Sequence, residues 1–292
     1  MTGTGTQTDP YIVMNYTDLC SMTGGNSSYY KLGADIDFAQ TDRKSTDGAI
    51  IISFKELDGN GHTISNFFGR IDSSAKYNAL FKFSSSYSPK IKNVNFVGIY
   101  FAGGITCMTD MSATSNYIYC ENCRFSVKIN DTQTAKYAFF NRFNLTDCEI
   151  LIEGTADFTK QITTATTSGC LIKLNLTFFN KNTTAVYTIL GGTLSFCGIT
   201  GKICCPNSAG ANYKLTENTT SNSYFALSFD NIASFSMNNS LTGVNFYDKE
   251  VMANVVNSLP SAGNFYALTT EQCKSAEYLQ SIDFPCVSGD TV

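Results

Sequence analysis

The feature that most constrains this chain is the stretch 54–68, FKELDGNGHTISNFF. Two short alternations of apolar and polar residues flank a tight turn, Asp58-Gly59-Asn60-Gly61. Glycine tolerates positive φ, and the Asp58 and Asn60 side chains can hydrogen-bond to their own turn backbone. Taken alone, the stretch is compatible with a β-hairpin. Its second half recurs along the chain, however, and this recurrence favours a repeated strand-and-turn unit.

The recurring unit is a polar residue followed by an apolar one, as in Asn93-Val94, Asn122-Cys123 and Asp147-Cys148. The apolar column continues at a spacing in the twenties, and its members are Val94, Cys123, Cys148, Ile172 and Cys197. A second apolar residue follows two places later, at Phe96, Phe125, Ile150, Leu174 and Ile199. A period in the twenties with strands and no helices inside it is typical of a β-solenoid.

Each coil of such a solenoid has an inward face that only stacking can bury. The alternation of side chains along a strand decides which of them point inward, and asparagines beside the column can form ladders between coils. We therefore predict an all-β fold, a single right-handed parallel β-helix with a short N-terminal capping helix and a small C-terminal helical cap.

The N-terminal segment differs from the repeat. A Gly/Thr run with D-P-Y-I at 9–12 precedes a short predicted helix at 15–22, for which Thr17 is the expected N-cap. A strand at 29–38, YYKLGADIDF, follows. The order G-T-G-T, D-P-Y-I, Y-K-L, D-I-D-F and D-G-N-G-H-T-I resembles the start of β-helix proteins of phage virions and of bacterial surfaces, among them surface proteins with Gly-Leu-rich repeats. The resemblance covers about the first 70 residues.

The C-terminal segment 268–279, LTTEQCKSAEYL, has a helical apolar pattern that Thr269 or Thr270 can cap. It resembles the closing segment of the same β-helix group. We expect an N-terminal cap at 1–40, the β-helix at 41–247 and a C-terminal cap at 248–292. The polar segments 106–116 and 206–223 are expected to be loops.

Composition excludes several classes. Only 15% of residues are charged, 43% are hydrophobic, and Phe (22) and Tyr (16) are abundant, which argues against disorder. The net charge is −4 and no basic run exceeds two residues, so nucleic-acid binding is not expected. No apolar stretch is long enough to predict membrane insertion. No signal peptide is recognisable, and we therefore expect accumulation in the cytoplasm.

The eleven cysteines show no regular pairing. Cys123, Cys148 and Cys197 are predicted to point inward as free thiols, where cysteine behaves as a small hydrophobe. Cys120 and Cys123 form a CxxC, but their odd separation predicts opposite sides of a strand, which argues against a shared site. Because the chain has one histidine, we expect no metal and no other cofactor.

A β-helix invites comparison with polysaccharide lyases and hydrolases, which use carboxylates on neighbouring coils. The best acid pair is Asp35 and Asp37, and His62 is the only histidine. All three lie in motifs that non-enzymes of this group share, and nothing resembles the paired-Asp, Gly-His-Gly and Arg-x-Lys set of polygalacturonases. We expect no catalytic residue and no enzyme activity.

A binding function needs no catalytic residues. Exposed tyrosines are enough for it, because tyrosine gives rigid amphipathic contact area. The candidates are Tyr29, Tyr30, Tyr77, Tyr87, Tyr100, Tyr117 and Tyr119, and packing within or at the edge of the coils is the plainer explanation for most of them.

Three functions remain open. The first is a non-enzymatic virion protein of a phage, a fibre, spike or capsid decoration that contacts the host surface; the second is a bacterial surface adhesin; the third is a polysaccharide lyase or hydrolase. The absent signal and the reduced-looking cysteines favour a virion assembled in the host cytoplasm over the bacterial cell surface. The resemblance implies other virion proteins and a host-surface glycan or protein receptor as partners. We also expect a homo-oligomer, with a trimer favoured by analogy and 268–292 as its contact.

Overall fold

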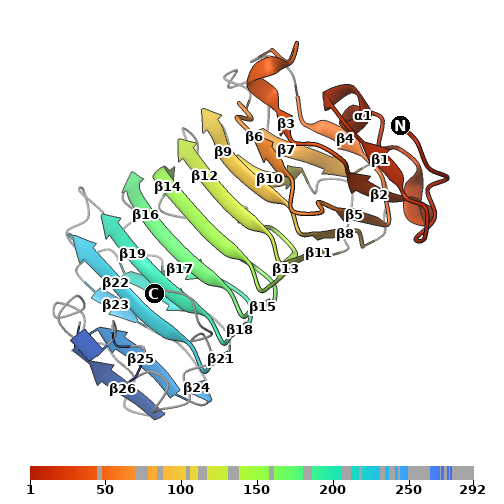
Figure 1. Ribbon diagram of the computed structural model, residues 1–292. Coiled ribbons are helices and arrows are strands. Elements are labelled where there is room, and N and C mark those ends of the chain that lie inside the picture. Colours follow the sequence, from red (N-terminus) through yellow and green to blue (C-terminus); the bar gives the residue numbers. More distant parts are fainter. Residues whose placement is uncertain are drawn as a thin grey trace.

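The computed structural model describes residues 1–44, 48–69, 78–83, 88–102, 106–110, 117–130, 138–157, 161–179, 186–204, 212–216, 219–230, 234–236, 241–242, 244–248, 264–269, 271–272, 275 and 277. Within them the chain winds as coils whose strands stack in register, from β1–β3 at one end to β25 and β26 at the other (Figure 1). Every pairing between named strands is parallel, which confirms the predicted all-β parallel solenoid.

Two long sheets form the walls of the solenoid. Sheet A contains β1 (Tyr11–Val13), β2 (Tyr29–Leu32), β5 (Glu56–Asp58), β8 (Lys90–Lys92), β11 (Ile118–Glu121), β13 (Phe143–Thr146), β15 (Thr167–Ser168), β18 (Leu194–Ser195), β21 (Thr220–Ser221) and β24 (Leu241–Thr242). Sheet B contains β3 (Ile36–Asp37), β6 (Thr63–Ser65), β9 (Asn95–Ala102), β12 (Arg124–Asn130), β14 (Glu149–Asp157), β16 (Leu171–Phe179), β19 (Gly198–Cys204), β22 (Tyr224–Asp230), β25 (Val244–Asp248) and β26 (Asn264–Leu268).

Two short sheets close the third side. One joins β4 (Ile50–Ile52), β7 (Asn78–Phe83) and β10 (Thr106–Asp110), and the other joins β17 (Val186–Leu190), β20 (Asn212–Thr216) and β23 (Ser234–Ser236). β10, β20 and β21 lie in the segments 106–116 and 206–223, so the prediction of loops there was wrong for these residues. β10 and β20 each contain only two apolar residues, Cys107 and Met108 in the first and Tyr213 and Leu215 in the second, and pairing with neighbouring coils supplies their backbone partners.

The chain passes from sheet A to sheet B through a corner with one residue in the left-handed region. These residues are Asn93, Asn122, Asp147, Gly169, Phe196 and Asn222, with φ between 47° and 65°. Asn, Asp and Gly are the residues that adopt this conformation at least cost. The turn at 58–61 makes the same passage with two such residues, Asn60 (φ 51°) and Gly61 (φ 80°). It is not a hairpin, because β5 belongs to sheet A and β6 to sheet B.

The corners also connect one coil to the next. The backbone N–H of Asn122 donates to the carbonyl of Thr146 (3.0 Å), and that of Asp147 donates to the carbonyl of Ser168 (2.9 Å). Side chains add the predicted ladder, in which Asn122 Nδ2 donates to Asn93 Oδ1 (2.8 Å) and Asn93 Nδ2 donates to Asp58 Oδ1 (3.0 Å). The backbone of the corners from Asn93 to Phe196 is thereby held by the coil that follows.

The residue after each corner points into the core. This column contains Val94, Cys123, Cys148, Cys170, Cys197 and Ser223, all buried, and its described cysteines are free thiols. Each thiol donates to the carbonyl two residues earlier, as Cys148 does to Thr146 (3.2 Å), and Ser223 Oγ makes the same bond to Ser221 (2.9 Å). The inward placement of Cys123, Cys148 and Cys197 as free thiols is confirmed.

Two details of the predicted columns were wrong. Ile172 is in register with Ile150 and Ile199, so it belongs to the second column, and Cys170 takes the place beside the corner. Gly169 hid this position because the recurring pattern calls for a polar corner residue. Cys120 and Cys123 are both buried rather than on opposite sides, because the left-handed residue Asn122 between them interrupts the alternation.

Phenylalanine fills the rest of the interior. The rings of Phe96 and Phe125 stack between neighbouring coils, with centroids 5.1 Å apart and an interplanar angle of 6°. A second series of edge and tilted ring contacts runs through Phe38, Phe67, Phe101 and Phe139, with centroid separations of 5.4, 5.6 and 5.8 Å. Such pairs add to the burial of apolar area and are repeated by each coil.

Helices occupy the first coils. α1 (Tyr16–Cys20) begins after Asn15, whose side chain accepts from the Asp18 N–H (3.0 Å), so the N-cap is Asn15 and not Thr17. Two 3₁₀ helices, η1 (Gly25–Ser27) and η2 (Phe38–Gln40), follow. Among the described residues no helix is long and apolar enough to cross a membrane.

At the C-terminal end, Leu268 closes β26 and is not helical as predicted. Thr269 is the cap, because its Oγ accepts from the Gln272 N–H (3.2 Å) and Gln272 Oε1 accepts from the Thr269 N–H (2.9 Å). The predicted contact at 268–292 lies mostly outside the described residues. The domain boundaries at 40 and 247 stay predictions; sheet strands lie on both sides of each.

We predict that position 148 tolerates serine and rejects aspartate. Cys148→Ser keeps the donor to the Thr146 carbonyl, as Ser223 does in its own coil. Cys148→Asp buries an unpaired charge at a site that is 2% exposed, which should cost several kcal/mol. Urea unfolding of both variants measures this. Equal midpoints for the two variants, or rapid labelling of Cys123, Cys148 and Cys197 in the native protein, would contradict the buried column.

Candidate functional site

Asp35 and His62 form one polar cluster of the first coils. His62 Nδ1 lies 3.0 Å from Asp35 Oδ1, and the same oxygen accepts from the Thr63 N–H (2.9 Å). The hydrogen bond from Thr63, followed by that from His62, lowers the pKa of Asp35. Because Thr63 opens β6 and Asp35 precedes β3, the carboxylate joins two neighbouring strands of sheet B.

Asp37 has a similar set of partners. Its Oδ1 accepts from Asn66 Nδ2 (2.9 Å) and from the Ala39 N–H (3.0 Å), and its Oδ2 accepts from Gln40 Nε2 (3.0 Å). These bonds, that of Asn66 first, lower the pKa of Asp37. A general acid at neutral pH needs a raised pKa, so neither Asp35 nor Asp37 is prepared for proton donation.

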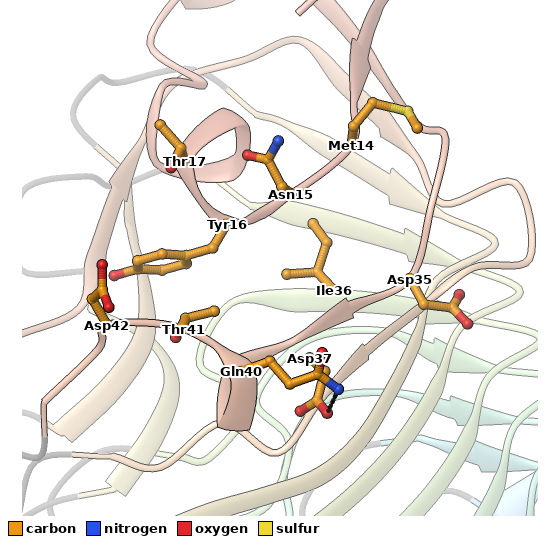
Figure 2. Close-up of a pocket in the computed structure, with 10 residues that line it drawn as sticks. All are labelled: Met14, Asn15, Tyr16, Thr17, Asp35, Ile36, Asp37, Gln40, Thr41 and Asp42. Atoms are coloured by element: carbon orange, nitrogen blue, oxygen red, sulfur yellow. Dashed lines mark hydrogen bonds between the residues drawn. The ribbon is translucent and has the colours of Figure 1, made fainter.

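A cavity of about 340 Å³ lies between the N-terminal end of α1 and η2 (Figure 2). Tyr16 and Asn15 line one wall, and Asp35, Asp37 and Asp42 line the other parts. Figure 2 shows the carboxylates of Asp35 and Asp42 at opposite ends of the cavity, while Asp37 lies beside Gln40. The volume suits a small molecule, but the acidic groups do not converge on a common point.

The predicted tyrosine candidates separate by exposure. Tyr30 is buried, Tyr29 lies under Lys55 (5.4 Å from Nζ to the ring centroid), and Tyr100 packs on Phe68. Tyr77 and Tyr87 lie outside the described residues. Tyr117 and Tyr119 are 47% and 45% exposed, so these two remain candidates for recognition on the outer side of sheet A.

The outward side of sheet A is charged near its N-terminal end. Lys92 Nζ lies 2.8 Å from Glu56 Oε1 and 3.5 Å from Asp58 Oδ2, and Lys90 pairs with Glu121 of the following strand. Because stacked strands place side chains directly beside one another, charges of alternating sign stabilise the stack. A groove of about 450 Å³ beside this charged ladder is bounded by the N-terminal segment at Gln7 and Pro10.

Sequence reasoning missed the neutral half of sheet A. The triplets Thr166-Thr167-Ser168, Thr193-Leu194-Ser195 and Thr219-Thr220-Ser221 each immediately precede a corner, and only their middle residues are buried. Phe196 is 42% exposed in the corner that follows the second triplet. Aligning the coils on their corners would have found this pattern, but Gly169 and Phe196 concealed two of those corners.

Metal binding has no evident site in the part of the chain that the structure describes, where no group of three His, Cys, Asp or Glu side chains is arranged to hold an ion. Burial raises the pKa of the Cys120 thiol. A thiolate is the form that binds metals, so burial disfavours ligation by Cys120.

The stacked coils of parallel strands place this chain in the class of parallel β-helix folds. No protein-family model matches the chain. No curated protein matches it. Among solved structures, one from Bacteroides ovatus described as a "putative immunoglobulin A1 protease" aligns with 93% of this chain and 88% of its own, at 17% sequence identity and a TM-score of 0.41. A likeness at this level carries no information about activity.

We predict that Asp58→Asn weakens the first coils and flattens their response to acid. Burial raises the pKa of Asp58, but hydrogen bonds from Asn93 and Asn60 and the Lys92 ammonium outweigh it, so the folded-state pKa is lowered. The stabilisation is therefore present above the unfolded-state pKa of about 3.9 and is lost as pH falls through the folded value.

Urea unfolding at about pH 7 and about pH 3.5 tests this prediction. At neutral pH the variant should lose at most about 1 kcal/mol, since solvent screens a partly exposed pair. Glu149→Gln is the control, because the Glu149–Arg124 pair is open to solvent on both sides. An Asp58→Asn variant with the same acid dependence as the native protein would count against the role of this carboxylate.

Proposed function

We propose that this chain is a non-enzymatic structural protein of a phage virion, a fibre, spike or capsid decoration that contributes to attachment to the host surface. The proposal is carried by the hydrogen bonds of Asp35, Asp37 and His62, because these bonds join neighbouring coils to one another. With these groups engaged in structure, the long outward faces of the solenoid are left as the surface for interaction.

The assignment to a virion rests on the resemblance of the cap motifs, D-P-Y-I at 9–12 and D-G-N-G-H-T-I at 58–64, to those of phage and bacterial-surface β-helix proteins. Its partners are other virion proteins and a glycan or protein of the host surface. We propose assembly as a homo-oligomer, with a trimer favoured by analogy and with 268–292 as the contact. A bacterial adhesin would use the same faces on a cell surface.

Phage particles of the source should therefore contain this chain at a fixed copy number. Mass spectrometry of purified particles measures its presence, and light scattering of the isolated protein measures its oligomeric state. The chain should also adsorb to whole host cells. Detection in the envelope fraction of uninfected bacteria, with none in particles, would replace the virion proposal with the adhesin.

We predict that the protein releases no product from polysaccharides. Incubation with polygalacturonate, alginate and hyaluronate should give neither new reducing ends nor unsaturated sugars, because Asp35 and Asp37 have lowered pKa values and fixed partners. Asp35→Asn and His62→Ala are the matched variants. Products that appear with the native chain and vanish in either variant would establish an enzyme.

A further inference from the structure

The charged half of sheet A presents two outward columns on β2, β5, β8 and β11. We call these outward residues the ladder face. One column reads tyrosine, acid, lysine, tyrosine, and the other reads lysine, acid, lysine, acid. The strand register holds each residue beside the next in its column, and in chain order the columns are Tyr29, Glu56, Lys90 and Tyr119, and Lys31, Asp58, Lys92 and Glu121.

Most charges of the ladder face have partners within the chain. Lys92 lies between Glu56 and Asp58, and Lys90 pairs with Glu121. Opposite charges on neighbouring strands stabilise the stack of coils. These pairs alone therefore require no second molecule.

Lys31 and Tyr119, on the first and last strands of the ladder face, do not have that explanation. Lys31 forms no ion pair within the described part of the chain. Asp58, beside it in the register, is bound to Lys92 and Asn93 instead. The Tyr119 side chain is 45% exposed, and no described residue makes a hydrogen bond or a ring contact with it. An ammonium and an aromatic ring are thus both available to a partner.

The two columns are complementary to their own reverse. When the order of the four strands is inverted, lysine meets acid at every charged position and tyrosine meets tyrosine. A two-fold axis parallel to the strands, above the boundary between β5 and β8, performs this inversion and keeps each column opposite its own copy. The pairs that it generates are Lys31 with Glu121, Asp58 with Lys92, Glu56 with Lys90, and Tyr29 with Tyr119.

The surface beside the ladder face has a matching shape. The groove of about 450 Å³ is lined by Tyr29, by Lys31 and by the N-terminal segment at Gln7. The two-fold axis places Tyr119 of the second copy over Tyr29, at this groove. It places β1 and the adjoining N-terminal segment opposite β13 of the second copy, whose outward side chains are short and uncharged. The exposed ring therefore meets a hollow, and the bordering segment meets small side chains.

We propose that the ladder face binds the ladder face of a second copy of this chain, with the two solenoid axes antiparallel. A second copy fits because it supplies Lys31 with the carboxylate that it lacks, and the symmetry supplies this pair twice. Two tyrosine pairs add rigid contact area of the kind that interfaces favour. The centre of the contact is charged, and its six facing strands span only roughly 29 Å at about 4.8 Å each, so the dimer is weak.

This contact goes beyond the homo-oligomer proposed above. It is separate from the contact at 268–292, since β2 and β26 belong to opposite ends of the solenoid (Figure 1). It does not rest on the assignment to a virion, because an adhesin with the same ladder face would dimerise in the same way.

Cross-linking of the full native chain tests the contact directly. Isotopically labelled and unlabelled protein are mixed in equal amounts and treated with a carbodiimide, which joins an ammonium to a carboxylate that touches it. Mass spectrometry of the digest should find Lys31 of one isotopic form joined to Glu121 of the other. Within one chain these two residues lie three strands apart, about 14 Å, and a product of mixed label comes only from two copies.

Exchange of the charges supplies the matched variants. Lys31→Glu and Glu121→Lys should each weaken dimerisation at least about tenfold in sedimentation equilibrium, because the symmetry repeats every lost contact. The double variant should regain dimerisation, because both pairs form again with their signs exchanged. Lys173→Glu makes the same change of charge on the exposed side of β16 in sheet B and should dimerise as the native protein does.

Two milder variants guard against loss of folding. Lys31→Gln removes the ammonium without placing like charges beside Asp58, and it should also weaken dimerisation. Tyr119→Asn removes the ring and introduces the residue that Asn144 places next in the same column. Both should unfold at the temperature of the native protein, and Tyr119→Asn should dimerise at least about tenfold more weakly.

An oligomer that yields no mixed Lys31–Glu121 product overturns the ladder face as a contact and leaves the homo-oligomer with its contact at 268–292. A chain that stays monomeric throughout the micromolar range overturns both. Folded single variants that dimerise like the native protein, or a folded double variant that does not regain dimerisation, also overturn the proposed pairing. The presence of the chain in phage particles is measured independently, so none of these outcomes decides the virion assignment.

Discussion

The rest of the structure depends on the hydrogen bonds that the corner residues from Asn93 to Phe196 donate to the end of the next strand of sheet A. A corner in the left-handed region turns the chain from one sheet to the other within a single residue, and its N–H then requires a partner. The following coil supplies that partner, as Ser168 does for Asp147 and Thr146 does for Asn122. The N–H of the corner residue therefore finds its partner only when the next coil is stacked in place.

The same corner determines what fills the interior. The left-handed residue interrupts the alternation of the strand. The residue two places before it and the residue directly after it therefore both point inward, as Cys120 and Cys123 do on either side of Asn122. Small side chains occupy the position after each corner, and those of Cys123, Cys148 and Cys197 return a hydrogen bond to the strand end. Phenylalanine fills the wider part of each coil, where rings from successive coils pack on one another.

Much of this fold was predictable because the spacing of apolar residues along the sequence equals the number of residues in one coil. The thiol column and the asparagine ladder followed from spacing and residue type alone. Ile172 was misplaced because a glycine corner carries no polar signal, and the odd separation of Cys120 and Cys123 misled because parity holds only within a strand. Two strands of the third side, Thr106–Asp110 and Asn212–Thr216, were missed for a different reason, since they lie in largely polar segments and pair with strands of neighbouring coils. The candidate site was less predictable. The polar residues near the cap could be picked from the sequence, whereas the exposure of Phe196 is known only from the register of the coils.

A surface that repeats at every coil does not specify a single position for a ligand that also repeats. The triplets before Gly169, Phe196 and Asn222 present nearly the same groups, so a polymer shifted by one coil meets almost the same partners. Translation along the axis then replaces one set of contacts with an equivalent set, and the number of equivalent placements adds a favourable entropy of its own. Phe196 has no aromatic counterpart at the neighbouring corners, which hold Gly169 and Asn222. A repeating ligand on such a solenoid would therefore have several equivalent positions along the axis.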